Sequence, residues 1–147
     1  MRLKAGGPPG WRARRRWGQN FLVNARAAET IVRIFAPRAD DIVLEVGPGR
    51  GALTERLVGR AQRIAAVEID PLLTAALRSR FAPESAAGRI AIVEADILVL
   101  DLPSLLTAAG ATPERRARVV ANLPYNIATG VILRLIEEQR LIEDLLV

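Results

Sequence analysis

Three glycines alternate with other residues in a short segment after an apolar run, at Gly47, Gly49 and Gly51. Glycine has no Cβ atom, so the backbone can approach a ligand closely there, and a helix that follows offers its amino-terminal N–H groups. The segment therefore predicts a loop that binds a nucleotide-like cofactor. A purely structural turn is the alternative, because Gly47-x-Gly49-x-x-Ala52 also fits the general dinucleotide pattern.

Two acidic residues, Glu68 and Asp96, each follow a later apolar run. A carboxylate at a strand end beside a glycine loop can accept hydrogen bonds from both ribose hydroxyls, which is the role predicted for Glu68. The Asp96 carboxylate can accept a hydrogen bond from the exocyclic amine of a cofactor adenine. The alternatives are an exposed strand-end acid for Glu68 and a helix or turn cap for Asp96. Ile69 and Ile97, which follow these acids, are also predicted to contact the cofactor.

The segment Asn122-Leu123-Pro124-Tyr125 follows another apolar run and is the most specific feature of the sequence. An aromatic amine is a poor nucleophile, because its lone pair is delocalised into the ring. The Asn122 side-chain oxygen and the Leu123 carbonyl can accept its two N–H bonds and favour a more pyramidal nitrogen. Pro124 stiffens the turn, and the ring of Tyr125 offers a face on which an extruded base can stack. We predict these four residues to be catalytic; a chance Asn-Pro turn is the alternative.

A further segment, Gly18-Gln19-Asn20-Phe21-Leu22, precedes the first expected helix. It could close over a cofactor, with Asn20 and the backbone at Leu22 as polar contacts. On physical grounds alone it is equally a helix-entry segment.

Alternating strands and helices are expected to position these residues. We predict strands at 42–46, 64–69, 90–93 and 117–121, helices at 25–35, 52–58, 71–81, 102–108 and 129–138, and the first residues of a fifth strand at 145–147. This alternation predicts an α/β fold, with a parallel sheet and helices on both faces. Ligands of such sheets bind at the carboxyl ends of the strands beside the switch point, where the three most unusual segments would lie.

The composition excludes several kinds of chemistry. The chain of 147 residues has the length of one domain and contains no cysteine and no histidine. Disulfides, thiolate or imidazole metal sites, cysteine nucleophiles and histidine-based triads are therefore excluded. No apolar run reaches the roughly 18 residues of a membrane span, so we expect a cytoplasmic protein with no metal and no membrane partner.

The positive charge of the chain lies at its beginning. Residues 1–16 hold six basic groups and no acids, whereas the remaining 131 residues hold 15 basic and 16 acidic groups. We expect residues 1–18 to be a flexible basic arm and 19–147 to be a cofactor-binding domain. The arm predicts a polyanionic partner, with candidate RNA contacts at Arg12, Arg14, Arg15 and Arg16. A solubilising tail or a mitochondrial presequence are the alternatives.

Five segments, taken together and in order, resemble the motifs of the ribosomal RNA adenine dimethyltransferase family. They are Gly18-Gln19-Asn20-Phe21-Leu22, Glu45-Val46-Gly47-Pro48-Gly49-Arg50-Gly51-Ala52-Leu53-Thr54, Val67-Glu68-Ile69-Asp70, Asp96 and Asn122-Leu123-Pro124-Tyr125-Asn126-Ile127. The similarity is greatest to the branch that dimethylates two adjacent adenosines of small-subunit ribosomal RNA during ribosome maturation. Relatives that modify large-subunit RNA and confer macrolide resistance tend to carry isoleucine where this chain has Leu123.

The resemblance implies a Rossmann-like methyltransferase fold and S-adenosylmethionine as cofactor. It implies cofactor contacts at Asn20, Leu22, Gly47, Glu68, Asp96 and Asn122, with Tyr125 at the target base. Family members have about seven strands and then a small helical domain that grips RNA, so we expect an incomplete, monomeric methyltransferase domain that lacks the later strands and that helical domain. Other hypotheses are the large-subunit activity, a non-catalytic RNA-binding module that keeps the cofactor fold, and a nicotinamide-dependent oxidoreductase.

Overall fold

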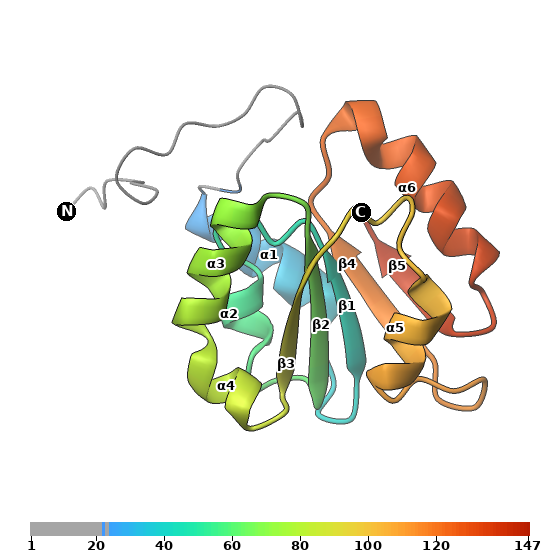
Figure 1. The fold of residues 1–147 in the computed structure, drawn as a ribbon, viewed down its shortest axis with the longest axis horizontal. Helices are drawn as coiled ribbons and strands as arrows, with labels where there is room; N and C mark the ends of the chain where they lie inside the picture. The colour runs from blue at the N-terminus through green and yellow to red at the C-terminus, as the bar shows by residue number, and fades with distance from the viewer. Residues whose placement is uncertain (1–21, 23) are drawn as a thin grey trace.

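A parallel five-stranded sheet forms the centre of the molecule (Figure 1). The computed structural model describes residue 22 and residues 24–147. The strands are β1 (Ile42–Val46), β2 (Arg63–Glu68), β3 (Ile90–Glu94), β4 (Ala117–Ala121) and β5 (Ile142–Leu146). They lie in the order β3-β2-β1-β4-β5, so the chain reverses its direction of winding between β1 and β4. The predicted parallel sheet and its switch point are confirmed.

Helices cover both faces of the sheet, as predicted (Figure 1). The helices α1 (Ala25–Phe35), α2 (Thr54–Leu57), α3 (Pro71–Arg80) and α4 (Ala82–Ala86) lie on one side, and α5 (Leu102–Ala108) and α6 (Tyr125–Glu137) on the other. Successive side chains of a strand point to opposite faces, so Val43 packs with α1 and Leu44 packs with α5 and α6. All five residues of β1 are buried, as a central strand between two helix layers requires.

The first helix begins and ends at the residues that its sequence signals indicate. Asn24 is the N-cap, and its side chain accepts hydrogen bonds from the backbone N–H groups of Arg26 and Ala27. The helix ends at Phe35, and its C-cap Ala36, directly before Pro37, has a left-handed φ of 48°. Its buried residues fall on the face toward the sheet. Leu22, just before the helix, lines a cavity at the carboxyl ends of the strands.

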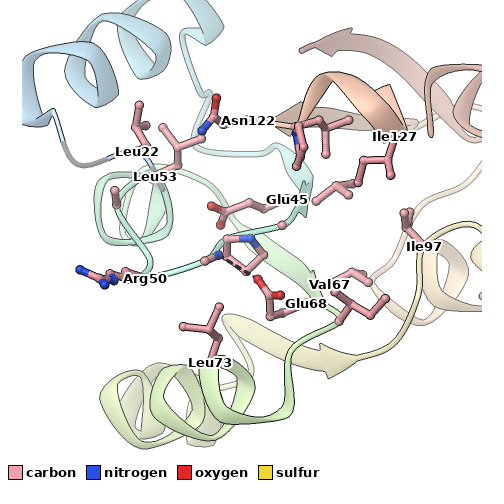
Figure 2. Close-up of a pocket in the computed structure, with 18 of the residues that line it drawn as sticks. Leu22, Glu45, Arg50, Leu53, Val67, Glu68, Leu73, Ile97, Asn122 and Ile127 are labelled. Carbon is pink, nitrogen blue, oxygen red and sulfur yellow. Dashed lines mark hydrogen bonds between the residues drawn. The ribbon is translucent and has the colours of Figure 1, made fainter. Parts of the chain in front are cut away.

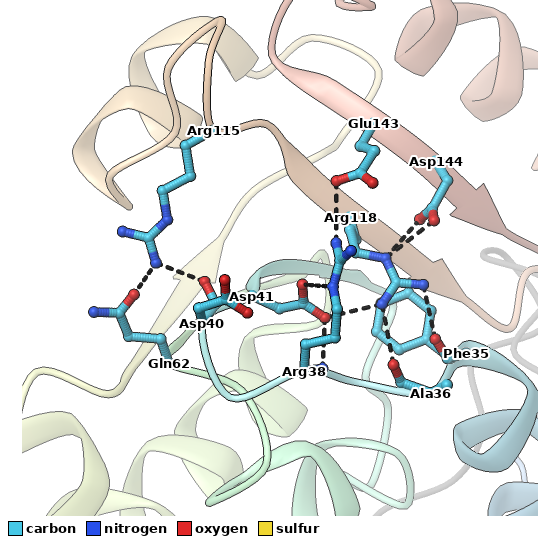
Figure 3. Close-up of polar contacts among 10 residues, drawn as sticks. All are labelled: Phe35, Ala36, Arg38, Asp40, Asp41, Gln62, Arg115, Arg118, Glu143 and Asp144. Carbon is cyan, nitrogen blue, oxygen red and sulfur yellow. Dashed lines mark hydrogen bonds and ion pairs between the residues drawn. The ribbon is translucent and has the colours of Figure 1, made fainter.

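A partly buried cluster of polar contacts around Arg118 joins α1 to the sheet (Figure 3). The Arg118 guanidinium donates to Asp41 at 2.9 Å, to Asp144 at 3.0 Å and to the carbonyl oxygen of Phe35 at 2.8 Å. It also lies 4.4 Å from the centre of the Phe35 ring. Burial by itself raises the pKa of Asp41, but hydrogen bonds from Arg38 and Arg118 outweigh it and lower that pKa. The contacts fix the carboxyl end of α1 against β1, β4 and β5.

The structure corrects several predicted boundaries. The helix expected at 129–138 already begins at Tyr125, because the Pro124 carbonyl accepts from the N–H groups of Ile127 and Ala128. In this helix Ile136 is 50% exposed, whereas Val131 and Leu135 are buried. The fifth strand begins at Ile142 rather than 145, since pairing with β4 extends over acidic residues of weak strand propensity.

Two helices also differ from the sequence-based expectation. The helix expected at 52–58 is only Thr54–Leu57, because the glycine loop continues as turns through Leu53. A short helix, Ala82–Ala86, follows α3 and was not predicted; Phe81 ends one helix and precedes the other. None of the helices in the described part of the chain is long and apolar enough to cross a membrane.

Candidate functional site

A cavity that is partly open to solvent lies at the carboxyl ends of the strands (Figure 2). Its wall combines the glycine loop after β1, the ends of β2 and β4, the turn after β3 and Leu22. Mostly apolar walls with a few polar groups are typical of small-molecule sites. The predicted residues that line it are Leu22, Gly47, Gly49, Glu68, Ile69, Asp96, Ile97, Asn122, Leu123 and Pro124.

The three glycines of the loop have different surroundings. All three have positive φ, at 68° for Gly47, 57° for Gly49 and 81° for Gly51, a region that other residues rarely adopt. A Cβ atom at Gly47 would meet nothing within 4 Å, whereas one at Gly51 would lie 3.1 Å from Leu77 and 3.2 Å from Phe81. Gly47 thus gives a ligand access to the backbone. Gly51 lies outside the cavity lining and instead lets the loop pack against α3.

Glu68 holds the glycine loop in place. Its Oε2 accepts from the Gly49 N–H at 2.9 Å, and its Oε1 accepts from the Asp70 N–H at 3.0 Å. The residue is 4% exposed, and burial raises the pKa of its carboxyl. Each carboxylate oxygen has a second lone pair, so Glu68 keeps the capacity to accept hydrogen bonds from a ligand's hydroxyls.

Glu45 is a site residue that sequence reasoning missed. It lies in β1, lines the cavity and is 1% exposed. The Thr54 hydroxyl donates to its Oε2 at 2.7 Å, whereas its Oε1 has no hydrogen-bond partner among the described residues. Burial, together with the nearby negative charge of Glu68, raises the pKa of Glu45 to about 7. Its signal in the sequence is an acid inside the apolar run of a central strand, where burial is expected.

Asp96 caps the turn after β3, which was the alternative role considered for it, and it also lines the cavity. It lines the cavity, and its Oδ1 accepts from the Leu98 N–H at 2.9 Å, which stabilises the turn after β3. Its neighbour Ile97 is buried and also belongs to the apolar cluster under α5 and α6. Ile69, on the other side of the opening, is 37% exposed. The turn therefore presents one carboxylate and one apolar wall to the cavity.

The segment after β4 reaches the cavity through its first three residues. Asn122, Leu123 and Pro124 line the cavity, because β4 lies next to β1 at the switch point. Tyr125 does not line it; this residue begins α6 and is 96% exposed. Pro124 connects the two with an extended backbone, at φ −61° and ψ 141°. The structure thus separates a cavity wall from an adjacent exposed aromatic ring.

Other candidate residues lie outside the described part of the chain. They are Asn20 in the segment before α1 and the four arginines of the basic arm, Arg12, Arg14, Arg15 and Arg16. Leu53 and Ile127, in contrast, line the cavity and were not predicted. Within residues 22 and 24–147, no group of three or more acidic side chains could hold a metal ion.

The parallel sheet with helices on both faces and a cavity at the switch point is a Rossmann-like methyltransferase fold. Solved structures share this fold. The chain is 31% identical to a structure described as the 23S rRNA methyltransferase ErmE, with a TM-score of 0.68 over 84% of this chain and 45% of the other. A dimethyladenosine transferase from Plasmodium falciparum is 25% identical, with a TM-score of 0.69 over 86% of this chain and 42% of that one.

The family model for ribosomal RNA adenine dimethylase matches residues 10–147, so this chain belongs to that family. Two relatives are described as ribosomal RNA small subunit methyltransferase A. This chain is 45% identical to the one from Geobacter metallireducens and 41% identical to the one from Hahella chejuensis. Both alignments cover 92% of this chain and 47% of the relative. The chain therefore spans about half the length of the relatives it matches.

Proposed function

We propose that the chain is the cofactor-binding part of an enzyme that dimethylates the N6 amines of adjacent adenosines in small-subunit ribosomal RNA. The observation that carries the proposal is the shared cavity at the switch point. It brings the glycine loop and Glu68 together with Asn122 and Leu123 in a member of the adenine dimethylase family.

The cavity has the chemistry that S-adenosylmethionine requires. Glu45 offers a buried carboxylate oxygen without a hydrogen-bond partner among the described residues, which suits a cationic ligand. Glu68 and Asp96 have lone pairs for hydroxyl or amine donors, and Leu53, Ile97 and Ile127 provide apolar walls. The bound cofactor would supply a methyl group made electrophilic by the neighbouring sulfonium. Polar groups and apolar walls together fit one nucleoside-containing cation.

Asn122 and Leu123 would orient the adenine amine. The amide oxygen of Asn122 and the carbonyl of Leu123 would accept its two N–H bonds, while Pro124 keeps this backbone extended. Tyr125, which is fully accessible beside the cavity mouth, would stack on the extruded base. These groups act by alignment, and the attack needs no general base before methyl transfer.

The proposed partner is ribosomal RNA within a small-subunit precursor. This assignment rests on the bacterial relatives described as ribosomal RNA small subunit methyltransferase A. We further propose a cytoplasmic, monomeric protein in which Asn20 closes over the cofactor and the four arginines of the arm contact RNA phosphates.

The test combines a binding measurement with a transfer measurement. Calorimetry with S-adenosylhomocysteine should detect binding, while NAD should not bind. In a complete protein that includes this chain, Asn122→Ala should abolish methyl transfer to small-subunit RNA and leave S-adenosylhomocysteine binding measurable. The matched control is Gln139→Ala, an exposed amide in the turn before β5, which should change neither. Unchanged turnover of Asn122→Ala would refute the assigned role, and preferred methylation of large-subunit RNA would refute the proposed substrate.

A further inference from the structure

Exposed arginines line the edge of the sheet opposite the cavity, where the strands begin. We call this the arginine edge; it consists of Arg60, Arg63, Arg89, Arg115, Arg116 and Arg140, all exposed. It is the lower edge of the sheet in the view of Figure 1. The register of the parallel strands places these arginines at the same end of the sheet. Arg63 pairs with Ile42, the first residue of β1, and Arg89 and Arg116 directly precede the first residues of β3 and β4.

The charges of this edge are not neutralised by acidic side chains. Arg63 donates to the carbonyl oxygen of Ala108, and Arg116 donates to that of Gln139. Arg115 donates to the carbonyl oxygen of Asp40 and to the side chain of Gln62 (Figure 3). These acceptors are neutral, so they orient the guanidinium groups without cancelling their charge. Within the described part of the chain, the side chains of Arg60, Arg89 and Arg140 make no hydrogen bond or ion pair.

The distribution of charge gives the molecule a basic end. The loops that precede the five strands, at 36–41, 58–63, 87–89, 109–116 and 138–141, hold seven arginines and four acids. The described residues as a whole hold 15 basic and 16 acidic groups. The rest of the described structure is therefore negative, and the positive potential concentrates at the edge away from the cavity.

The same loops lack an apolar surface. The large exposed hydrophobic residues of the described structure all lie elsewhere, in helices, in the turns around the cavity and at the end of β5. Protein interfaces depend on a buried apolar or aromatic core, whereas nucleic-acid interfaces are polar and strongly positive. The surface therefore fits a phosphodiester backbone better than an acidic protein. With strands about 4.8 Å apart, five strands give an edge of roughly 19 Å, long enough to reach several phosphates.

We propose that the arginine edge is a second RNA-contact surface, which binds the phosphate backbone at the end of the domain remote from the cavity. This inference rests on the proposed function in that the substrate is RNA. The edge would hold a distant part of the same large RNA while the cavity receives the reacting base. Guanidinium groups bind phosphate in a bidentate way, and each contact releases condensed counterions.

The experiment measures how RNA binding depends on salt. The full chain is titrated with a fluorescent RNA duplex of about 20 base pairs between 50 and 200 mM salt, and the same is done for Arg60→Gln/Arg89→Gln/Arg140→Gln. Each phosphate contact contributes about 0.7–0.9 to the slope of log K against log salt. The triple variant should therefore lower the slope by about two and weaken binding about ten- to hundredfold at 100 mM salt.

Matched variants separate position and charge from a general effect. Arg26→Gln/Arg33→Gln/Arg78→Gln removes the same charge from exposed positions on α1 and α3 and should leave the slope close to that of the unmodified chain. Arg60→Lys/Arg89→Lys/Arg140→Lys should restore most of the slope. An edge variant with the unmodified slope, an equal loss in both glutamine variants, or absence of RNA binding by the unmodified chain would overturn the proposal. Stronger competition by polyglutamate than by RNA would assign the edge to an acidic protein instead.

Cofactor binding distinguishes this proposal from the proposed function. S-adenosylhomocysteine should bind the unmodified chain and the edge variant equally, since the edge lies at the other end of the strands. If both bind it and the salt slope is unchanged, the arginine edge is refuted and the proposed function stands. If neither binds it and the slope falls as expected, the proposed function is refuted and the edge stands.

Discussion

Replacing Glu45 by glutamine should make the stability of the protein less dependent on pH. The pKa of this carboxyl rises from 4.5 in the unfolded chain to about 7 in the folded protein, mainly because it is buried. A group whose pKa is higher in the folded than in the unfolded protein makes its full contribution to the free energy of unfolding below the unfolded pKa. That contribution is lost as the pH rises through the folded pKa. Between pH 4.5 and about 7, Glu45 therefore lowers the free energy of unfolding by about 1.4 kcal/mol per pH unit.

The expected total is about 3 kcal/mol, which is large relative to the stability of a domain of this size. Glutamine cannot ionise, and its amide oxygen can still accept from the Thr54 hydroxyl. Below pH 4.5 the free energies of unfolding of Glu45→Gln and the unmodified chain should therefore differ little. Above pH 7 the difference should have shifted by about 3 kcal/mol in favour of the variant.

Urea unfolding at unit intervals from pH 4 to pH 8 measures this difference directly. Comparison of the two proteins cancels the contributions of carboxyls that do not interact with Glu45, whereas the interaction with Glu68 is part of the measured difference. Glu94→Gln, the same substitution at an exposed position of β3, is the control for the change from a carboxylate to an amide. If the difference between Glu45→Gln and the unmodified chain stayed constant from pH 4 to pH 8, the Glu45 carboxyl would ionise normally in the folded protein and the argument from burial would be wrong.

Three further substitutions test the loop and the ion pair beneath α1. Gly51→Ala should lower the free energy of unfolding by about 2 kcal/mol, from left-handed strain plus contact with Leu77, as measured by urea unfolding. Gly47→Ala should cost about 1 kcal/mol in the same assay, but calorimetry should show a loss of S-adenosylhomocysteine affinity out of proportion to that cost; proportional losses would contradict an open cavity there. Asp41→Asn should destabilise by about 2 kcal/mol at pH 7, because it removes one of the two carboxylates that pair with the partly buried Arg118. Since the pKa of Asp41 is lowered, its contribution is present above the unfolded pKa of 3.8 and is lost as the pH falls through the folded value, so thermal denaturation should show the difference between the two proteins shrink in acid.

Local signals in the sequence were sufficient for most of the elements. The cap at Asn24, proline at the start of α3 and the apolar runs of β1 and β4 depend on neighbouring residues, and these elements were placed to within one residue. The alternation of strands and helices determined a parallel sheet, because crossover connections leave few other arrangements. That the motifs gather at one edge then follows from the polarity of parallel strands.

The extent of β5 depended on tertiary contacts, whereas the first turn of α6 forms locally. The sequence 125–128 has no strong helix signal, and this turn forms on the carbonyl of Pro124. Glu143 and Asp144 have low strand propensity, yet they form part of β5 because β4 offers backbone partners and Arg118 pairs with Asp144. Long-range pairing thus outweighed local preference in β5.

The sequence by itself determined the class of fold, the glycine loop and the identity of the side chains that gather at the switch point, because these follow from residue type, spacing and strand polarity. Only the tertiary structure decided that Gly51 packs against α3, that Glu68 holds the loop, and that Glu45 is buried with one oxygen unpaired. Burial and hydrogen-bond partners depend on segments far apart in the chain, so no local pattern encodes them, and the pKa of a carboxyl depends on both.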